Sequence, residues 1–340
     1  QLNGTSTTNV AVINNATVTG AGVAVTGTAS GNGGGISSSG TITATAGNVT
    51  LNGTSNGANS GVYSSAAITS NTGDVNITGT SVTGGGVTLQ GSVTAQNNVT
   101  INGTSSSTSS AAQGVVIQNA VKANTGDITV TGNTNSNVQR AVALTVNGAV
   151  NGSLQTLAAG RNININADTL YVHTSTSVNA TSTGTVNIKT TNGNRIELGS
   201  GDTMNSTAAS RVLGLDQGEL NRITAGKLVI GSATGGDIKV ANVITTQDAT
   251  GDLTLRTGGN VNIANNLTVG ATGGKNLTIE AAGASSTVDG SGVVKANALK
   301  ITGANASVAM ASVAHQVSTL SADVKALAFK NSQEIGRAHV

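Results

Sequence analysis

Fourteen acidic side chains are the residues of this chain that could carry out acid–base chemistry. Enzymes that cleave polysaccharides hold two carboxylates close together, one to give a proton and one to accept it or to attack. Asp248 and Asp252 lie close in the sequence, but no partner base is evident beside them. Asp252 also belongs to a group that directly follows glycine before an apolar segment, which is a turn position (Asp74, Asp127, Asp237 and Asp252). The other acids are Asp168, Asp202, Asp216, Asp289, Asp323, Glu197, Glu219, Glu280 and Glu334.

Histidine is a frequent catalytic base and metal ligand, and it occurs here at three widely separated positions, His173, His315 and His339. This spacing indicates neither a His-based triad nor a zinc site. Cysteine is absent, which excludes disulfides and thiolate ligands. The glycine run at 33–35 lacks the Lys-Ser/Thr tail of a phosphate-binding loop, and the calcium-binding Gly-Gly-x-Gly-x-Asp repeat does not occur. We therefore predict no catalytic, cofactor-binding or metal-binding residues, and we expect the chain not to be an enzyme.

The composition indicates a narrow, repetitive interior. Among 340 residues there are no Pro and no Trp, and the aromatic residues are Tyr63, Tyr171 and Phe329. A large globular core normally uses aromatic side chains because they bury the most area. Here the apolar residues are mainly Val, Ile, Leu and Ala, and the formal net charge is only +2. The chain shows no basic patch that would suggest nucleic-acid binding, and no apolar run long enough to cross a membrane.

A short sequence motif is repeated through the first half of the chain. The segment Gly73-Asp-Val-Asn-Ile-Thr-Gly-Thr-Ser81 returns in similar form at 47–55, 98–105 and 126–132. A second landmark recurs at intervals of 26, 26, 25, 28 and 27 residues, at Asn9-Val10, Gly35-Ile36, Gly61-Val62, Gly86-Val87, Gly114-Val115 and Ala141-Val142. Self-similarity at a fixed period of this size is typical of a stacked repeat architecture.

Each repeat has the period of two that is typical of half-buried β-strands. In the repeated motif Val75 and Ile77 alternate with Asn76 and Thr78, so one face of the predicted strand is apolar and the other is polar. About three such strands, separated by Gly and Asn turn residues, fit in one repeat of roughly 25 residues. We predict an all-β fold, a right-handed parallel β-helix (β-solenoid) with about three short strands per rung. With a rung spacing of ~4.8 Å, roughly 13 rungs would form a rod about 60 Å long.

We expect two regions along this rod. Residues 1–166 form regular rungs rich in Thr, Asn and Gly, and 167–333 continue as a less regular β-helix. Asp216 and Glu219 have the spacing of a capping box, which predicts a short helical insertion near 216–222. Thr54, Thr80 and Thr104 should form a polar ladder outside. The Thr-x-Thr segments at 17–19 and 41–45, of the kind found in ice-binding β-helices, do not recur at one rung position, so we expect no ice-matching lattice.

Three segments resemble repeats of very large secreted bacterial proteins of the filamentous haemagglutinin family. They are LGLDQGELNRITAGKLVIGSATGGDIKV (213–240), DLTLRTGGNVNIANNLTVGATGGKNLTIEAAG (252–283) and GSGVVKANALKITGANASVAM (290–310). Residues 1–166 resemble the looser repeats of the same exoproteins. The resemblance implies a β-helical shaft that leaves a Gram-negative cell by two-partner secretion. The family's N-terminal secretion domain carries an Asn-Pro-Asn-Leu motif; this chain has no Pro, so we read it as an internal fragment.

The resulting functional hypothesis is the structural shaft of a secreted or cell-surface adhesin-like exoprotein, which provides reach and display for adhesion or biofilm formation. An outer-membrane secretion partner would act through the missing N-terminal domain, and the surface receptor is unknown. We expect no nucleic acid, no membrane insertion, and end-to-end self-association of the fragment. The alternative is a β-helical carbohydrate-active enzyme or autotransporter passenger with a catalytic face.

The last residues, 334–340, differ in kind from the repeats. They contain no Thr or Asn and no strand alternation, and Ile335-Gly-Arg-Ala-His-Val340 is the translation of a common sequencing adapter in one reading frame. We expect this tail to be non-native and assign no function to Arg337 or His339.

Overall fold

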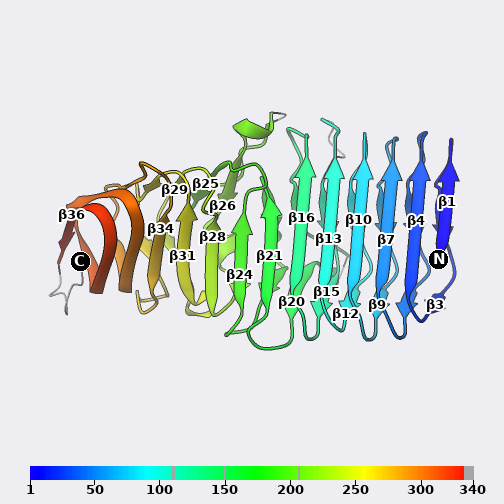
Figure 1. The fold of residues 1–340 in the computed structure, drawn as a ribbon, viewed down its shortest axis with the longest axis horizontal. Coiled ribbons are helices and arrows are strands. Elements are labelled where there is room, and N and C mark those ends of the chain that lie inside the picture. Colours follow the sequence, from blue (N-terminus) through cyan, green and yellow to red (C-terminus); the bar gives the residue numbers. More distant parts are fainter. Residues whose placement is uncertain (109–111, 149, 206, 333–340) are drawn as a thin grey trace.

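The computed structural model describes residues 1–108, 112–148, 150–205 and 207–332, and these residues form a β-solenoid. It has about 11 turns of roughly 26 residues, three parallel sheets and 3% helix. Figure 1 shows the coils side by side along the long axis, with β1 at one end and β36 at the other. The strands in front point upward while the chain advances to the left, so the coil is right-handed (Figure 1). The predicted fold class is confirmed.

The first face of the solenoid carries the longest strands. Each pairs in parallel with its equivalents in the neighbouring coils, and β1 at the N-terminal end pairs with β4. In spatial order they are β1 (Leu2–Ser6), β4 (Val23–Ala29), β7 (Val49–Ser55), β10 (Val75–Ser81), β13 (Val99–Ser105), β16 (Ile128–Thr134), β21 (Asn162–Ala167), β24 (Thr185–Lys189), β28 (Lys227–Gly231), β31 (Asp252–Thr257), β34 (Leu277–Ala281) and residues 299–302 of β36 (Val294–Asn331).

The second face is built from shorter strands that follow a turn after the first face. Its first part contains β2 (Val12–Asn14), β5 (Ile36–Ser38), β8 (Val62–Ser64), β11 (Val87–Leu89), β14 (Val115–Ile117), β17 (Val142–Leu144) and β22 (Leu170–Val172). Its second part contains β26 (Val212–Leu215), β25 (Arg195–Leu198), β29 (Ile238–Val240), β32 (Val261–Asn262) and β35 (Thr287–Asp289).

The third face closes each coil. It contains β3 (Val18–Gly20), β6 (Ile42–Ala44), β9 (Ile68–Ser70), β12 (Val93–Ala95), β15 (Ala120–Ala123), β20 (Ser153–Thr156), β23 (Ser177–Asn179) and β27 (Ile223–Thr224). After β27 this face continues with β30 (Ile244–Thr245) and β33 (Leu267–Thr268).

The core is a continuous column of aliphatic side chains inside the coil. Val49, Val75, Val99 and Ile128 are in register across neighbouring strands, and each is fully buried. The predicted alternation therefore marks the inside of the solenoid, because successive side chains of a strand point to opposite faces. The predicted outer threonine ladder is also present: Thr54 and Thr80 are adjacent and their hydroxyls lie 3.3 Å apart.

The rungs are fewer than the roughly 13 predicted because two of them carry insertions. Most first-face residues pair across 22 to 29 positions, but Ile128 pairs with Ile163 across 35 and Val186 pairs with Leu228 across 42. The first insertion includes the antiparallel hairpin β18 (Val146–Asn147) and β19 (Val150–Asn151). The second includes β25, the 3-10 helix η1 (Ala208–Ser210), β26 and the helix α1 (Gln217–Leu220).

Within the second insertion the chain turns back on itself. Strand β25 precedes β26 in the sequence, yet β25 is the strand that pairs with β29 of the following coil. Strand β26 therefore lies on the N-terminal side of β25, next to β22. Helix α1 lies within the predicted 216–222 segment and begins with the predicted capping box of Asp216 and Glu219. A further 3-10 helix, η2 (Asp248–Thr250), lies at a later corner.

Strand β36 closes the described structure as a long continuous ribbon. It pairs in turn with β33, β34 and β35, so it passes around all three faces (Figure 1). The end of the ribbon returns to the middle of the same strand, where the Ser332 amide donates to the His315 carbonyl at 2.8 Å. The predicted non-native tail at 334–340 lies outside the described residues.

Two sequence-based expectations were wrong in register. Val12 pairs with Ile36, so the landmark placed at Asn9-Val10 is two residues early. The expectation that the Thr-x-Thr segments do not recur at one rung position was also wrong. Thr19 and Thr43 occupy equivalent positions on the third face, in a column that continues with Thr69 and Thr94. Unequal spacings of 24, 26 and 25 residues hid this column, because loops of different length keep the strands in register. The described residues contain no helix that is both long and apolar enough to span a membrane.

Candidate functional site

The aspartates that follow glycine belong to a ladder that links neighbouring coils. Asp74 Oδ1 accepts the backbone N–H of Asn98 at 2.9 Å, and Asp127 Oδ1 accepts that of Asn162 at the same distance. Asn98 Oδ1 in turn accepts the N–H of Asp127 at 2.9 Å. Asp237 and Asp252 make the equivalent contact with Asn260 and Asn276. Their carboxylates thus satisfy strand-entry amides, which accords with the turn position predicted from the sequence.

One pair of acids that the sequence did not connect comes together beside β22. Asp202 Oδ2 accepts the N–H of Leu170 at 3.0 Å, and its Oδ1 accepts the N–H of Gly214 at 3.0 Å. Arg140 Nε lies 3.4 Å from Asp202 Oδ2. The Asp202 side chain is 1% exposed. A carboxylate therefore bridges β22 and β26 where the two strands share no regular ladder.

Glu219 performs the same task at the other end of β22. Its Oε1 accepts the N–H of Val172 at 3.0 Å, and its Oε2 accepts the N–H of Asp216 at 3.1 Å. Arg222 Nη1 donates to the Val172 carbonyl at 2.6 Å. Helix α1 thus uses one glutamate both to cap its own first turn and to satisfy a strand of the preceding coil.

Burial dominates the electrostatics of this pair. It raises the pKa of Asp202 to about 8, and the nearby Glu219 carboxylate adds to the rise while Arg140 and two backbone amides oppose it. Burial also raises the pKa of Glu219 above its ordinary value, again against two backbone hydrogen bonds. Raised carboxyl pKa values are a feature of general acids. Both carboxyl groups already accept two backbone N–H groups each, however, so the arrangement is suited to joining strands rather than to meeting a substrate.

The histidines are placed apart, as their spacing indicates. His173 contacts the edge of Tyr171, with 6.1 Å between ring centroids. His315 is buried and stacks on Phe329 at 4.8 Å, and His339 lies outside the described residues. Within the described ranges no group of three or more His, Cys, Asp or Glu side chains has the arrangement of a metal site.

A polar groove runs over the outer side of the first face, from β16 to β34. Two adjoining cavities of about 750 and 620 Å³ share Asn166, Lys189 and Ser232. Amide side chains on its floor are partly engaged with one another: Asn187 Nδ2 donates to Asn164 Oδ1 at 2.9 Å. At its far end Arg256 forms an ion pair with Glu280, which lowers the pKa of that carboxyl. The groove is wide and open. Glu280 is the acidic residue that lines it, and the charge of Glu280 is offset by Arg256.

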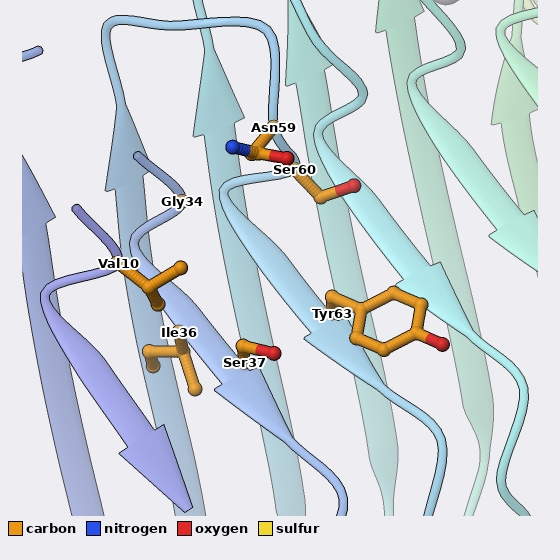
Figure 2. Close-up of a pocket in the computed structure, with 7 residues that line it drawn as sticks. All are labelled: Val10, Gly34, Ile36, Ser37, Asn59, Ser60 and Tyr63. Atoms are coloured by element: carbon orange, nitrogen blue, oxygen red, sulfur yellow. The ribbon is translucent and has the colours of Figure 1, made fainter. Parts of the chain in front are cut away.

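A smaller hollow lies on the outer side of the second face, near the N-terminus (Figure 2). It has a volume of about 280 Å³, and the aromatic ring of Tyr63 forms one of its walls. Sequence reasoning missed it because its lining residues come from three successive coils. The available signal was Tyr63 itself, a rare aromatic residue at an outward-facing strand position.

No family model, no curated protein and no solved structure matches this chain. The resemblance to the filamentous haemagglutinin family therefore stays a prediction from the quoted segments. The structure supports the coarser statement, that the chain is a β-solenoid of a kind compatible with a fragment of a β-helical adhesin.

Proposed function

We propose that this chain is the structural shaft of an adhesin-like exoprotein, secreted or held at the surface of a Gram-negative bacterium. Its task is to hold other parts of the molecule at a distance for adhesion or biofilm formation. The observation that supports this proposal is the uninterrupted aliphatic core, which extends from Val23 and Val25 in β4 to Val317 and Leu320 in β36.

The mechanical properties of such a shaft add up coil by coil. Each coil contributes parallel ladder hydrogen bonds and several fully buried Val, Ile or Leu side chains, each worth about 1.5–3 kcal/mol on burial. The Asp–Asn ladder adds charge-assisted hydrogen bonds between neighbouring coils, as between Asp74 and Asn98. A rod built in this way keeps its direction because each coil contacts only its neighbours.

The proposal includes a non-enzymatic role, export through an outer-membrane secretion partner, and a surface receptor bound by another part of the exoprotein. The alternative of a carbohydrate-active enzyme requires an accessible acid pair. The two acids whose pKa values are raised, Asp202 and Glu219, are buried and already engaged with backbone amides. Incubation of the purified chain with polysaccharides should release no new chain ends. Turnover that disappears in Asp202→Asn or Glu219→Gln would contradict the non-enzymatic proposal.

A replacement experiment tests the shaft role directly. In the exoprotein, the segment 1–332 is exchanged either for an unrelated β-solenoid of similar length or for a Gly/Ser linker of about 25 residues, whose average end-to-end distance of roughly 25–30 Å is about half the length of the 11-turn rod. Antibody access to an epitope placed after the segment is then measured on intact cells. A shaft predicts that the foreign solenoid preserves access and that the flexible linker reduces it. Equal access with both replacements would contradict the proposal.

A further inference from the structure

The hollow near the N-terminus is built by three consecutive coils of the second face. Figure 2 shows its lining residues on β5, on β8 and on the loops that enter β2, β5 and β8. Ser37 and Tyr63 are register partners on β5 and β8 and lie side by side on the outer surface. The complete lining is Val10, Gly34, Ile36, Ser37, Asn59, Ser60 and Tyr63.

The hollow exists because Gly34 has no side chain. A Cβ atom built on Gly34 would lie 3.0 Å from the Ser60 carbonyl oxygen, 3.4 Å from Asn59 Cβ and 3.9 Å from Val10 Cγ2. It would therefore project among the lining residues. Gly34 is not one of the glycines with positive φ, so its own φ does not require glycine. The constraint at this point is instead the close approach of the Ser60 carbonyl oxygen, against which an added methyl group would be tight.

The Tyr63 ring is held in one position. Its hydroxyl donates a hydrogen bond to Gln90 Oε1 at 2.7 Å, in the next coil. The small Ser37 side chain on the neighbouring strand leaves the ring uncovered on that side (Figure 2). A fixed, partly exposed aromatic ring offers apolar area at little cost in conformational entropy.

Polar groups surround the ring without being fully used. Asn59 Nδ2 donates to the Asn32 carbonyl at 2.8 Å, which leaves Asn59 Oδ1 as an acceptor. Ser60 Oγ lies 3.1 Å from Thr88 Oγ1 and retains further hydrogen-bonding capacity. The loop that carries both residues is fixed from inside, because Ser81 Oγ donates to the Asn59 carbonyl at 2.9 Å.

The surroundings of the hollow carry no charged side chain. Residues 1–73 contain no Asp, Glu, Lys, Arg or His. A charged ligand would lose hydration here without gaining an ionic partner. The suitable ligand is therefore neutral, with an apolar face for Tyr63 and hydroxyl groups for Ser37, Asn59 and Ser60.

We propose that this hollow binds one neutral pyranose ring of a glycan, with the C–H face of the sugar on the Tyr63 ring and its hydroxyls on Ser37, Asn59 and Ser60. A cavity of about 280 Å³ accommodates one sugar ring and leaves neighbouring sugars in solvent. This binding site goes beyond the shaft role and does not depend on it, because a solenoid can be stiff with or without a surface site.

The test uses the 340-residue chain with the methyl glycosides of glucose, galactose and N-acetylglucosamine as probes. Saturation-transfer NMR detects binding, and titration gives the affinity. For one sugar ring on one aromatic residue we expect Kd on the order of 1 mM for at least one probe. Tyr63→Ala and Gly34→Ala should each weaken that binding about tenfold or more, the first by removing the stacking face and the second by filling the hollow.

Two variants serve as controls. Gly22 is a loop glycine before β4 that does not line the hollow, and its added Cβ would meet neighbours only at 3.5 Å or more. Gly22→Ala should leave the affinity within about twofold, and Tyr63→Phe should retain most of it because the aromatic face remains. Circular dichroism shows whether each variant keeps the fold. Absence of saturation transfer for all three probes at 20-fold above the expected Kd, about 20 mM, would overturn the proposal, as would unchanged binding by a folded Tyr63→Ala variant.

Discussion

Asp202 Oδ2 accepts the backbone N–H of Leu170 at 3.0 Å, across 32 positions of sequence. In the regular coils this kind of strand amide is satisfied by a carbonyl of the next strand, as the Val142 amide is by the Thr169 carbonyl. At β22 the chain instead inserts a carboxylate from a loop between β25 and β26. The second insertion is therefore attached to β22 of the preceding coil by side chains, and the stability of this junction should depend on their protonation.

We expect the contribution of Asp202 to the stability of the chain to decrease between pH 4 and pH 8. The pKa of Asp202 rises from 3.8 to about 8 on folding, so the folded state binds its proton more tightly than the unfolded state. This contribution is complete below the unfolded pKa and is lost as the pH rises through the folded one. Asp202→Asn should flatten the dependence of the unfolding midpoint on pH in this window. Adding Glu219→Gln should flatten it further, and an unchanged slope in the double variant would refute the assignment.

His315 should make the last coil sensitive to acid. His315 Nδ1 accepts the Val294 N–H at 3.0 Å and Nε2 lies 2.8 Å from the Met310 carbonyl, so the neutral ring carries its proton on Nε2. Burial lowers the pKa of His315 below its ordinary 6.5. Protonation would add a hydrogen to Nδ1, which would then face the Val294 N–H and replace the hydrogen bond by repulsion. The stability contributed by this contact is therefore present above pH 6.5 and decreases as the pH falls below that value.

Hydrogen exchange measures this effect at one amide. The protection factor of the Val294 N–H, corrected for the intrinsic exchange rate, should fall between pH 7 and pH 5. His315→Phe removes the titrating group and should give lower protection that does not vary with pH. A protection factor that is constant in the unmodified chain would contradict the prediction.

A charge inside the aliphatic column should unfold the neighbouring coils. Ile77 is fully buried between Leu51 and Ile101. Ile77→Asp would place a carboxylate there with no partner, at a cost of several kcal/mol. Thr78→Asp is the matched control, because Thr78 is exposed on the outer side of the same strand and should change stability by about 0.5 kcal/mol or less. Urea denaturation of both variants makes the comparison, and equal midpoints would contradict the inside–outside assignment.

Removing whole coils should preserve the fold. Deletion of residues 49–98 joins Asn48 to Val99, and Val99 occupies the same register position as Val49. The shortened chain should fold with an unchanged circular dichroism spectrum per residue. Deletion of 49–61 instead joins Asn48 to Val62, a second-face residue, and should disrupt the coils around the junction. If both deletions behave alike, stacking of equivalent positions does not determine the fold.

The 340-residue chain should associate end to end. Strand β1 pairs only with β4 among the described residues, so its outer edge can pair with another chain. Light scattering should report growth with concentration, and Leu2→Lys with Thr5→Lys should reduce it. Thr28→Lys on β4 places the same charge next to a strand that is paired on both edges and should have little effect. A monomer at all concentrations would rule out exposed pairing edges.

The sequence determined the fold class because its information is local and repeated. Val75 and Ile77 alternate with Asn76 and Thr78, which gives the strand one buried and one exposed face. Because this pattern returns about every 25 residues, equivalent strands must stack on one another in successive coils. The turn aspartates and the capping box of α1 were readable for the same reason, because each depends on residues within a few positions of one another.

Tertiary structure decided what depends on register between coils. The third-face threonine column and the true landmark at Val12 were hidden by loops of unequal length. The pairing of Asp202 with β22 required the chain to turn back between β25 and β26, and no local pattern encodes that reversal. The Tyr63 hollow likewise depends on Gly34 and Ser37, which lie more than twenty residues before Tyr63 and reach it only because one coil lies directly on the next.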